Sequence, residues 1–241
     1  MTVETPLVKR YHYVILQVGT LPLSPDGSYN ASVEHRCTSA LIWPEHDLPS
    51  IETTLLTDPC FTSRGYQHAI EEMKRLDISF LNIGWIFITH RHRDHCSNLS
   101  HFIGRTTYKD FHNSPNSQLS GMITVPYPGH APVQKGLAFH SSSHQNICIC
   151  GDAVLNLEWL RAWKYYWPNF YQEPEIIQTW ESVARILVYA DVIIPGHGRP
   201  FQVTPPLLEH LLATFPQAEH ASKCQDVELM LEKRLEQLQT L

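Results

Sequence analysis

One short run, residues 89–95, constrains this chain more than any other stretch. It reads Thr-His-Arg-His-Arg-Asp-His, so four side chains that can bind a metal ion fall within six positions. Neutral imidazole and carboxylate are ligands of zinc, and they also suit iron and manganese. The apolar residues 85–88 come directly before the run and indicate a strand. The sequence therefore predicts a metal-binding loop at the end of a strand.

Two other interpretations of this run have to be weighed. A helix with histidines four positions apart is a common arrangement of metal ligands, but Arg91 and Arg93 interrupt the histidines and favour a loop. The chain holds 15 histidines, so a chance cluster is the second alternative. The tight register behind a strand argues against chance, and three later stretches add to that argument.

Each of these later stretches is an apolar run that ends in a turn with glycine, after which a side chain that can bind a metal follows. They are 122–125 with His130, 146–150 with Asp152, and 191–194 with His197. A glycine beside each of these side chains lets the backbone approach a crowded ion without a clash. We therefore expect the strand ends to meet on one side of the fold.

Composition excludes several classes of protein. The 43% hydrophobic and 17% charged residues are typical of a soluble globular chain. A formal net charge of -6 gives no electrostatic case for sequence-blind binding to nucleic acid, although it leaves room for a local basic groove. No stretch approaches the roughly 20 apolar residues that cross a bilayer. No secretory signal is visible, and the six cysteines form no Cys-x-x-Cys pair, so we expect a cytoplasmic protein with reduced thiols.

Apolar patterning predicts the order of the elements. The expected strands are 13–18, 38–43, 53–57, 85–88, 122–125, 146–150 and 191–194. The expected helices are 65–76, 97–102, 175–188, 205–214 and 224–238. One domain over 1–241 is the simplest organisation, with the helices of 205–240 packed on it. Pairing of the last helix with a second subunit, in a homodimer, is the alternative to that docking.

In their order, these residues resemble the five sequence motifs of the metallo-β-lactamase fold superfamily, over about 14–203. The motif residues are Asp58, His90-x-His92-x-Asp94-His95, His130, Asp152 and His197. The subgroup that the chain resembles most is the small single-domain metallo-β-lactamase domain-containing proteins, through 14–17, 151–154 and 190–203. The resemblance implies an α/β fold: a four-layer αββα sandwich, with two mixed sheets back to back and metals at one edge.

The resemblance also implies two metal sites that share one carboxylate. The ligands would be His90, His92 and His130 for the first ion, Asp94, His95 and His197 for the second, and Asp152 for both. Asp58 would brace the histidine loop without touching metal. Here Pro59 and Cys60 follow it where many relatives have a glycine nearby, so that loop is expected to differ.

Hydrolysis is the activity that the resemblance implies. A hydroxide bridging two ions roughly 3.5–4 Å apart would attack a carbonyl carbon or a phosphorus. Asp94 would pass a proton to the leaving group. Zinc is the expected metal, with iron or manganese as alternatives that these ligands do not separate. An ester, lactone or thioester of modest size is the expected substrate.

Three other functions stay open. A metal-dependent phosphodiesterase or endonuclease acting on single-stranded RNA is the first, since the aromatic residues of 159–171 would stack on bases as readily as line an apolar pocket. A single-iron thiol dioxygenase is the second, although His95 and His197 would supply a second site. A metal-bound scaffold without catalysis is the third.

Other members of the superfamily fit less well. Diiron flavoproteins have Glu where this chain has His92, and the commonest lactam-cleaving enzymes have Cys in place of Asp152. Nucleases with a large cap need a longer insert before His197. Glutathione thioesterases need a larger C-terminal domain. Homoserine-lactone lactonases usually carry Tyr where Leu155 stands.

Several further residues could bind metal or react, but packing explains them better. The histidines in question are His101, His112, His140 and His144, of which the last two are expected to flank a hairpin turn. Cys60 and Cys96 are expected in the core near the metals, and Cys148 and Cys150 within a packed strand. Ser141–Ser143 have no visible base partner, so a serine nucleophile is not supported.

Overall fold

A computed structural model describes residues 9–100, 109–110 and 119–240. The strands follow one hydrogen-bonded order, in which non-consecutive neighbours mark crossovers. They are β1 (Arg10–Gln17), β2 (Ser39–Pro44), β3 (Thr54–Thr57), β4 (Ile83–Phe87), β5 (Lys109–Asp110), β6 (Ile123–Pro126), β7 (Lys135–Ser141), β8 (Asn146–Gly151), β9 (Val192–Pro195) and β10 (Phe201–Gln202). The order is β10-β9-β8-β7-β1-β2-β3-β4-β5, and β6 pairs with β7.

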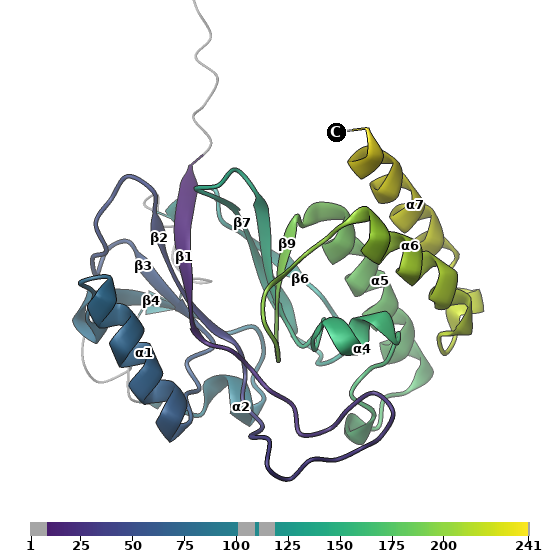
Figure 1. Ribbon diagram of the computed structural model, residues 1–241, viewed down its shortest axis with the longest axis horizontal. Coiled ribbons are helices and arrows are strands. Elements are labelled where there is room, and N and C mark those ends of the chain that lie inside the picture. The colour runs from purple at the N-terminus through teal and green to yellow at the C-terminus, as the bar shows by residue number, and fades with distance from the viewer. Residues whose placement is uncertain (1–8, 101–108, 111–118, 241) are drawn as a thin grey trace, which may run out of the picture.

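The helices lie outside the strands on both sides (Figure 1). The α-helices are α1 (Ser63–Arg75), α2 (Arg93–Cys96), α4 (Leu157–Arg161), α5 (Glu173–Tyr189), α6 (Pro205–Thr214) and α7 (Gln225–Gln239). Short 3-10 turns are η1 (Phe80–Asn82), η4 (Trp167–Asn169), η5 (Phe215–Gln217) and η6 (Ala221–Lys223). No helix of the described ranges is both long and apolar enough to cross a membrane.

The strands form two halves that face each other across a shared core. β1–β5 make one half and β6–β10 the other, and within the described ranges the strand pairing that joins them consists of two parallel residue pairs between β1 and β7. Side chains from both halves fill the space between, among them Tyr11, Trp85, Phe139 and Ile149. Figure 1 shows α1 beyond the first half and α4–α7 beyond the second. The predicted four-layer αββα arrangement is confirmed, with the two sheets continuous at that one junction.

The helices bury apolar faces that the sequence patterns mark. α1 covers the first half with Ala69 and Met73, and the hydroxyl of Thr62 caps its start. α5 buries Trp180 and seven other residues against the second half. α7 buries Val227 and Leu231 in the same cluster.

An ion pair fastens α7 to the sheet. The Arg234 guanidinium donates to Asp191 Oδ1 at 2.7 Å and to the Ala190 carbonyl at 3.1 Å. Asp191 Oδ2 also accepts from the backbone N–H of Asn146 at 2.8 Å, at the start of β8. The C-terminal helix is therefore tied directly to the base of the strands that lead to Asp152 and His197.

Three expectations about the elements were wrong. A short helix was expected at 97–102, but α2 ends at Cys96, residues 97–99 form a turn, and residues 101–102 lie outside the described ranges. β7 was missed, because its apolar part is only three residues long and its strand character comes from three neighbouring strands. Leu76 was expected on the buried face of α1, but the helix ends one residue before it and its side chain is 41% exposed.

Replacement of Leu208 by Ala tests the packing of the helical layer. Leu208 is completely buried among α5, α6 and α7. Leu208→Ala is expected to lower the free energy of unfolding by about 2–5 kcal/mol, because it removes apolar contacts and leaves a cavity. Urea unfolding followed by circular dichroism measures this loss.

The matched control is Leu229→Ala, on the exposed side of α7 with 48% of its surface exposed. It is expected to change the free energy of unfolding by no more than about 0.5 kcal/mol. Equal losses in the two variants would contradict the packing described here.

Candidate metal centre

The ends of four strands meet at one edge of the sandwich. His90 and His92 follow β4, and α2 then presents Asp94 and His95. The other half of the fold supplies the remaining three side chains from the segments after β6, β8 and β9: His130, Asp152 and His197. The seven form two groups, and within each group the facing atoms lie within 4.8 Å of one another. A loop was expected for the whole run 89–95, which is wrong for Asp94 and His95, because they lie on the single helical turn of α2.

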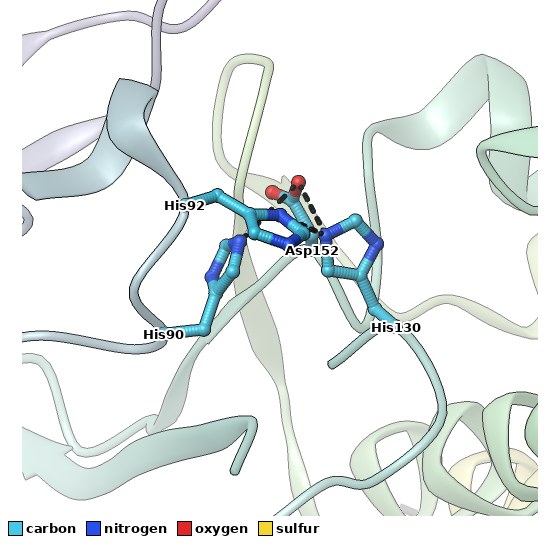
Figure 2. A group of neighbouring side chains, drawn as sticks. All are labelled: His90, His92, His130 and Asp152. Atoms are coloured by element: carbon cyan, nitrogen blue, oxygen red, sulfur yellow. Dashed lines mark hydrogen bonds and ion pairs between the residues drawn. The ribbon is translucent and has the colours of Figure 1, made fainter. Parts of the chain in front are cut away.

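The first group gathers three imidazoles around one carboxylate oxygen. Figure 2 shows His90, His92 and His130 turned toward Asp152. His130 Nε2 lies 2.9 Å from His92 Nδ1 and 3.2 Å from Asp152 Oδ2. His90 Nε2 lies 3.9 Å from the same oxygen. One ring nitrogen of each histidine therefore faces a common point.

The second group uses the other oxygen of the same carboxylate. Asp152 Oδ1 lies 3.0 Å from His95 Nε2 and 3.2 Å from His197 Nε2. Asp94 Oδ2 closes the group at 3.4 Å from His197 Nε2 and 3.7 Å from His95 Nε2. His197 Nε2 also lies 3.3 Å from Asp152 Oδ2, but Oδ1 is nearest to His95 and Oδ2 is nearest to His130, so the carboxylate is placed to bridge the two groups.

The chemistry of these atoms fits divalent metal ions. His90 Nε2, His95 Nε2 and Asp152 Oδ1 are buried and form no hydrogen bond of good geometry, although His95 Nε2 and Asp152 Oδ1 lie 3.0 Å apart. Buried polar atoms without partners are costly, and a bound cation would satisfy all three. Nitrogen and carboxylate donors in this number suit zinc or iron.

Burial and the neighbouring charges together set the protonation of the cluster. It lowers the pKa of His90 to about 2 and the pKa of His130 to about 4, so both rings are neutral at pH 7. Burial also opposes protonation of His95, but Asp152 and Asp58 outweigh it and raise the pKa of His95 well above its usual value. Burial would raise the pKa of Asp152, yet the nearby histidines hold it well below its ordinary value. In the first group His90 and His130 therefore offer neutral nitrogens, whereas an ion at the second group must displace a proton from His95.

Asp58 lies beneath the cluster and points away from it. Its Oδ1 accepts from the Thr89 backbone N–H at 2.8 Å, and its Oδ2 accepts from the Thr89 hydroxyl at 2.8 Å. His95 Nδ1 donates to Oδ2 at 3.0 Å, which leaves His95 Nε2 to face the second group. Asp58 thus holds Thr89 and His95 in place without facing either ligand group. Asp58 also has a left-handed backbone (φ 40°), a strained conformation for a residue other than glycine.

Two glycines near the predicted ligands are needed for close approach. A Cβ on Gly196 would lie 1.9 Å from Asp152 Oδ1, so a side chain there would displace the shared carboxylate. A Cβ on Gly129 would lie 2.3 Å from Thr179 Oγ1 on α5, and its φ of +129° also disfavours other residues. Both glycines let the segments before His197 and His130 reach the centre.

Sequence reasoning missed two residues at the centre. His35 Nε2 lies 3.1 Å from Asp94 Oδ2, and its ring centroid is 5.1 Å from that of His197. The Tyr171 hydroxyl lies 2.7 Å from His130 Nδ1. His35 stands in an irregular segment with no sequence signal. Tyr171 was noted only as one member of the aromatic stretch.

An open cleft of about 510 Å³, including its mouth, leads to the centre. Its walls include Leu21 and His35 on one side and Tyr166 and Asn169 on the other. A narrower, more enclosed cavity, with room for little more than one water molecule, adjoins it at His130 and Asp152. The lining of this second cavity is mainly apolar and aromatic, with Trp163, Tyr165, Tyr171, Trp180 and Val183 among its residues.

The aromatic stretch divides between the core, the walls of the cavities and the surface. Trp159 and Trp163 are buried in the core. Tyr165 and Tyr171 line the narrower cavity, and Tyr166 lines both the narrower cavity and the open cleft. Exposed rings complete the stretch, since Trp167 is 50% and Phe170 86% exposed.

Of the other residues weighed from sequence, those that the structure describes belong to neither group, and the rest lie outside the described ranges. Residues 142–144 form the turn between β7 and β8, as expected for the segment from His140 to His144. Cys60, Cys148 and Cys150 are buried, but Cys96 is only partly buried. His101 and His112 lie outside the described residues.

Comparison with known proteins gives a relative by sequence. No protein-family model matches the chain. Over 152 residues the chain is 27% identical to metallo-β-lactamase domain-containing protein 1 of Xenopus laevis, across 56% of this chain and 62% of that protein. The chain thus spans less than two thirds of the length of this relative.

Solved structures share the layered fold at low identity. A Thermotoga maritima protein assigned to the metallo-β-lactamases matches 80% of this chain and 99% of its own, with 18% identity and a TM-score of 0.52. A Staphylococcus aureus protein assigned as a metal-dependent hydrolase matches 79% and 90%, with 10% identity and a TM-score of 0.54. The chemotaxis sensor ODP, seen with a peroxy diiron species, matches 88% and 92%, with 18% identity and a TM-score of 0.53. The chain therefore has the layered fold of these metallo-β-lactamase structures, and in sequence it is similar to a metallo-β-lactamase domain-containing protein.

Proposed function

We propose that this protein is a hydrolase with two divalent metal ions that cleaves an ester, lactone or thioester bond. The shared carboxylate carries the proposal, because Asp152 is placed to bridge two complete ligand groups. In the assignment proposed here, the first ion binds His90, His92 and His130, and the second binds Asp94, His95 and His197. A pair of such ions lowers the pKa of water to about 7 and stabilises negative charge on a substrate oxygen.

Asp94 is the proposed proton carrier. Its side chain is 22% exposed and lines the cleft, whereas that of Asp152 is 5% exposed. Burial acts to raise the pKa of Asp94, but His35 and the nearby histidines hold it below its usual value. As a carboxylate at the cleft wall, Asp94 is placed to take a proton from the attacking water and hand it to the leaving group.

The charge of the cleft favours a neutral carbonyl substrate. Arg93 is the one arginine or lysine among the described residues that line the cleft, and acidic Asp94 stands beside it. A polyanion would need several cations along its path. The adjoining cavity beside His130 is lined mainly by apolar side chains, with Lys164 as its one lysine or arginine among the described residues, and has room for a very small group only.

Cleavage of a phosphodiester in single-stranded RNA is the second candidate. The exposed rings of Trp167 and Phe170 favour it, since they flank Asn169 at the cleft and bases stack on such rings. A single-iron thiol dioxygenase is less well supported, because the ligand group around His95 and His197 is complete.

Substitution of His92 tests the hydrolase proposal. Metal-loaded wild type, assayed on aryl esters, lactones, thioesters, a bis-aryl phosphodiester and short RNA, is expected to hydrolyse a carbonyl substrate. His92→Ala is expected to lower kcat/KM on the order of 100-fold or more, because a lost ligand costs at least as much as a lost supporting residue.

The control for that assay is His46→Ala, at an exposed histidine whose side chain is 87% exposed. It should retain full activity. Full activity in His92→Ala with the fold intact would refute the proposal.

Salt dependence separates the two substrate classes. The KM for a neutral ester is expected to stay constant between about 50 and 200 mM salt, because no counterions are released on binding. RNA binding, measured by fluorescence anisotropy, would instead weaken steeply over the same range. A steep salt dependence accompanied by RNA cleavage would favour the phosphodiesterase.

Proton release on metal binding tests the ligand assignment. His95 has a raised pKa, so it keeps its proton in the metal-free protein, and an ion must displace that proton. Zinc affinity is therefore expected to rise with pH until the pH passes the pKa of His95. Calorimetric titrations at pH 7 in buffers of different ionisation enthalpy measure the protons released. Binding of about two ions without proton release would contradict the role of His95.

A further inference from the structure

The histidines of the two groups differ in what supports their outer ring nitrogens. In the second group, His95 Nδ1 donates to the carboxylate of Asp58 at 3.0 Å, and His197 Nδ1 donates to the carbonyl of Arg36 at 2.8 Å. In the first group, the partner of His130 Nδ1 is the hydroxyl of Tyr171, at 2.7 Å. A phenol is neutral and can donate as well as accept, so it supports a ring less strongly than an anion.

The direction of the His130 hydrogen bond follows from the geometry of the ring. His130 Nε2 faces the first group, 2.9 Å from His92 Nδ1 and 3.2 Å from Asp152 Oδ2. A nitrogen that binds an ion must offer a lone pair, so the proton of the neutral ring has to sit on Nδ1. In that tautomer, Nδ1–H donates to the Tyr171 oxygen.

Tyr171 is itself held in place from two sides. Asn169 Nδ2 donates to its hydroxyl oxygen at 3.1 Å, and the ring of Tyr165 packs edge-on with centroids 5.1 Å apart. Two residues later α5 begins, and its buried residues Ile176 and Trp180 anchor it in the core. The hydroxyl therefore has a fixed position against His130.

We infer that Tyr171 is a positioning residue that fixes the tautomer and orientation of His130, and that binding of the first ion depends on it. The second ion does not, because both histidines of its group have other supports. This inference rests on the two-ion site of the proposed function. Binding of an ion at the first site would then depend on the aromatic segment that lines the cleft and its adjoining cavity.

Tyr171→Phe removes the hydroxyl and keeps the ring. The metal-free variant is titrated with cobalt(II), which reports each bound ion through its visible absorption, and affinities come from competition with a chelator. The first ion is expected to bind about 10–100-fold more weakly, as is usual when a supporting partner of a metal-bound histidine is lost. The second ion is expected to bind as in wild type. Circular dichroism and thermal unfolding of the metal-free variant confirm that the fold is kept.

The matched control is Tyr165→Phe, which removes a hydroxyl from the same segment. That hydroxyl donates to Glu219 Oε2 at 2.8 Å on the exposed side, away from the metal ligands. Cobalt binding at both sites should stay unchanged in this variant. Equal weakening in the two tyrosine variants would overturn the inference, because it would point to the segment as a whole.

Two backgrounds assign the effect to one site. With His197→Ala only the first group keeps all its histidines, and adding Tyr171→Phe is expected to weaken the remaining ion about 10-fold or more. With His90→Ala only the second group is complete, and Tyr171→Phe is expected to have no effect. The reverse pattern, or no effect in either background, would overturn the inference.

The outcome also separates this inference from the proposed function. Two ions bound by wild type and equally by Tyr171→Phe would refute the role of Tyr171 and leave the hydrolase intact. One ion bound by wild type, at the second group alone, would refute both.

Discussion

The carboxylate of Asp152 is the interaction on which the rest of the centre depends. It is 6% exposed, and one of its oxygens is nearest to His95 and the other to His130. Such a collection of buried donors and acceptors is unfavourable by itself, because several of its atoms form no hydrogen bond of good geometry. Positive ions bound at this edge of the sandwich would satisfy these atoms and make the cluster stable.

Support for the cluster comes from a second ring of contacts. Asp58 holds His95 directly, and through the hydroxyl of Thr89 it reaches His90, whose Nδ1 lies 3.2 Å from that oxygen. The carboxylate of Asp58, a residue with a strained backbone, thus orients a histidine of each group. At His130 the supporting group is instead the hydroxyl of Tyr171.

Much of the fold and the predicted ligands could be read from the sequence, because local signals carried them. Residues 89–95 follow a strand, and the later candidates each follow an apolar run beside a glycine. Those signals predicted that the side chains meet at the strand ends, and the resemblance to the metallo-β-lactamase motifs implied the αββα class, whereas metal binding by the seven side chains stays a prediction. His35 and Tyr171 could not be found this way, since they approach the centre from irregular segments through tertiary contacts. β7 escaped for a similar reason, because its neighbours in space decide that it is a strand.

The narrow junction between β1 and β7 has a consequence for the whole molecule. Few backbone pairs join the two halves there, and the proposed ligands divide between them: four come from the first half, and His130, Asp152 and His197 come from the second. Each ion would therefore act as a cross-link between sheets that are otherwise held mainly by apolar contact. Because such a cross-link exists only in the folded chain, mass action would make the cohesion of the sandwich depend on the concentration of free metal around it.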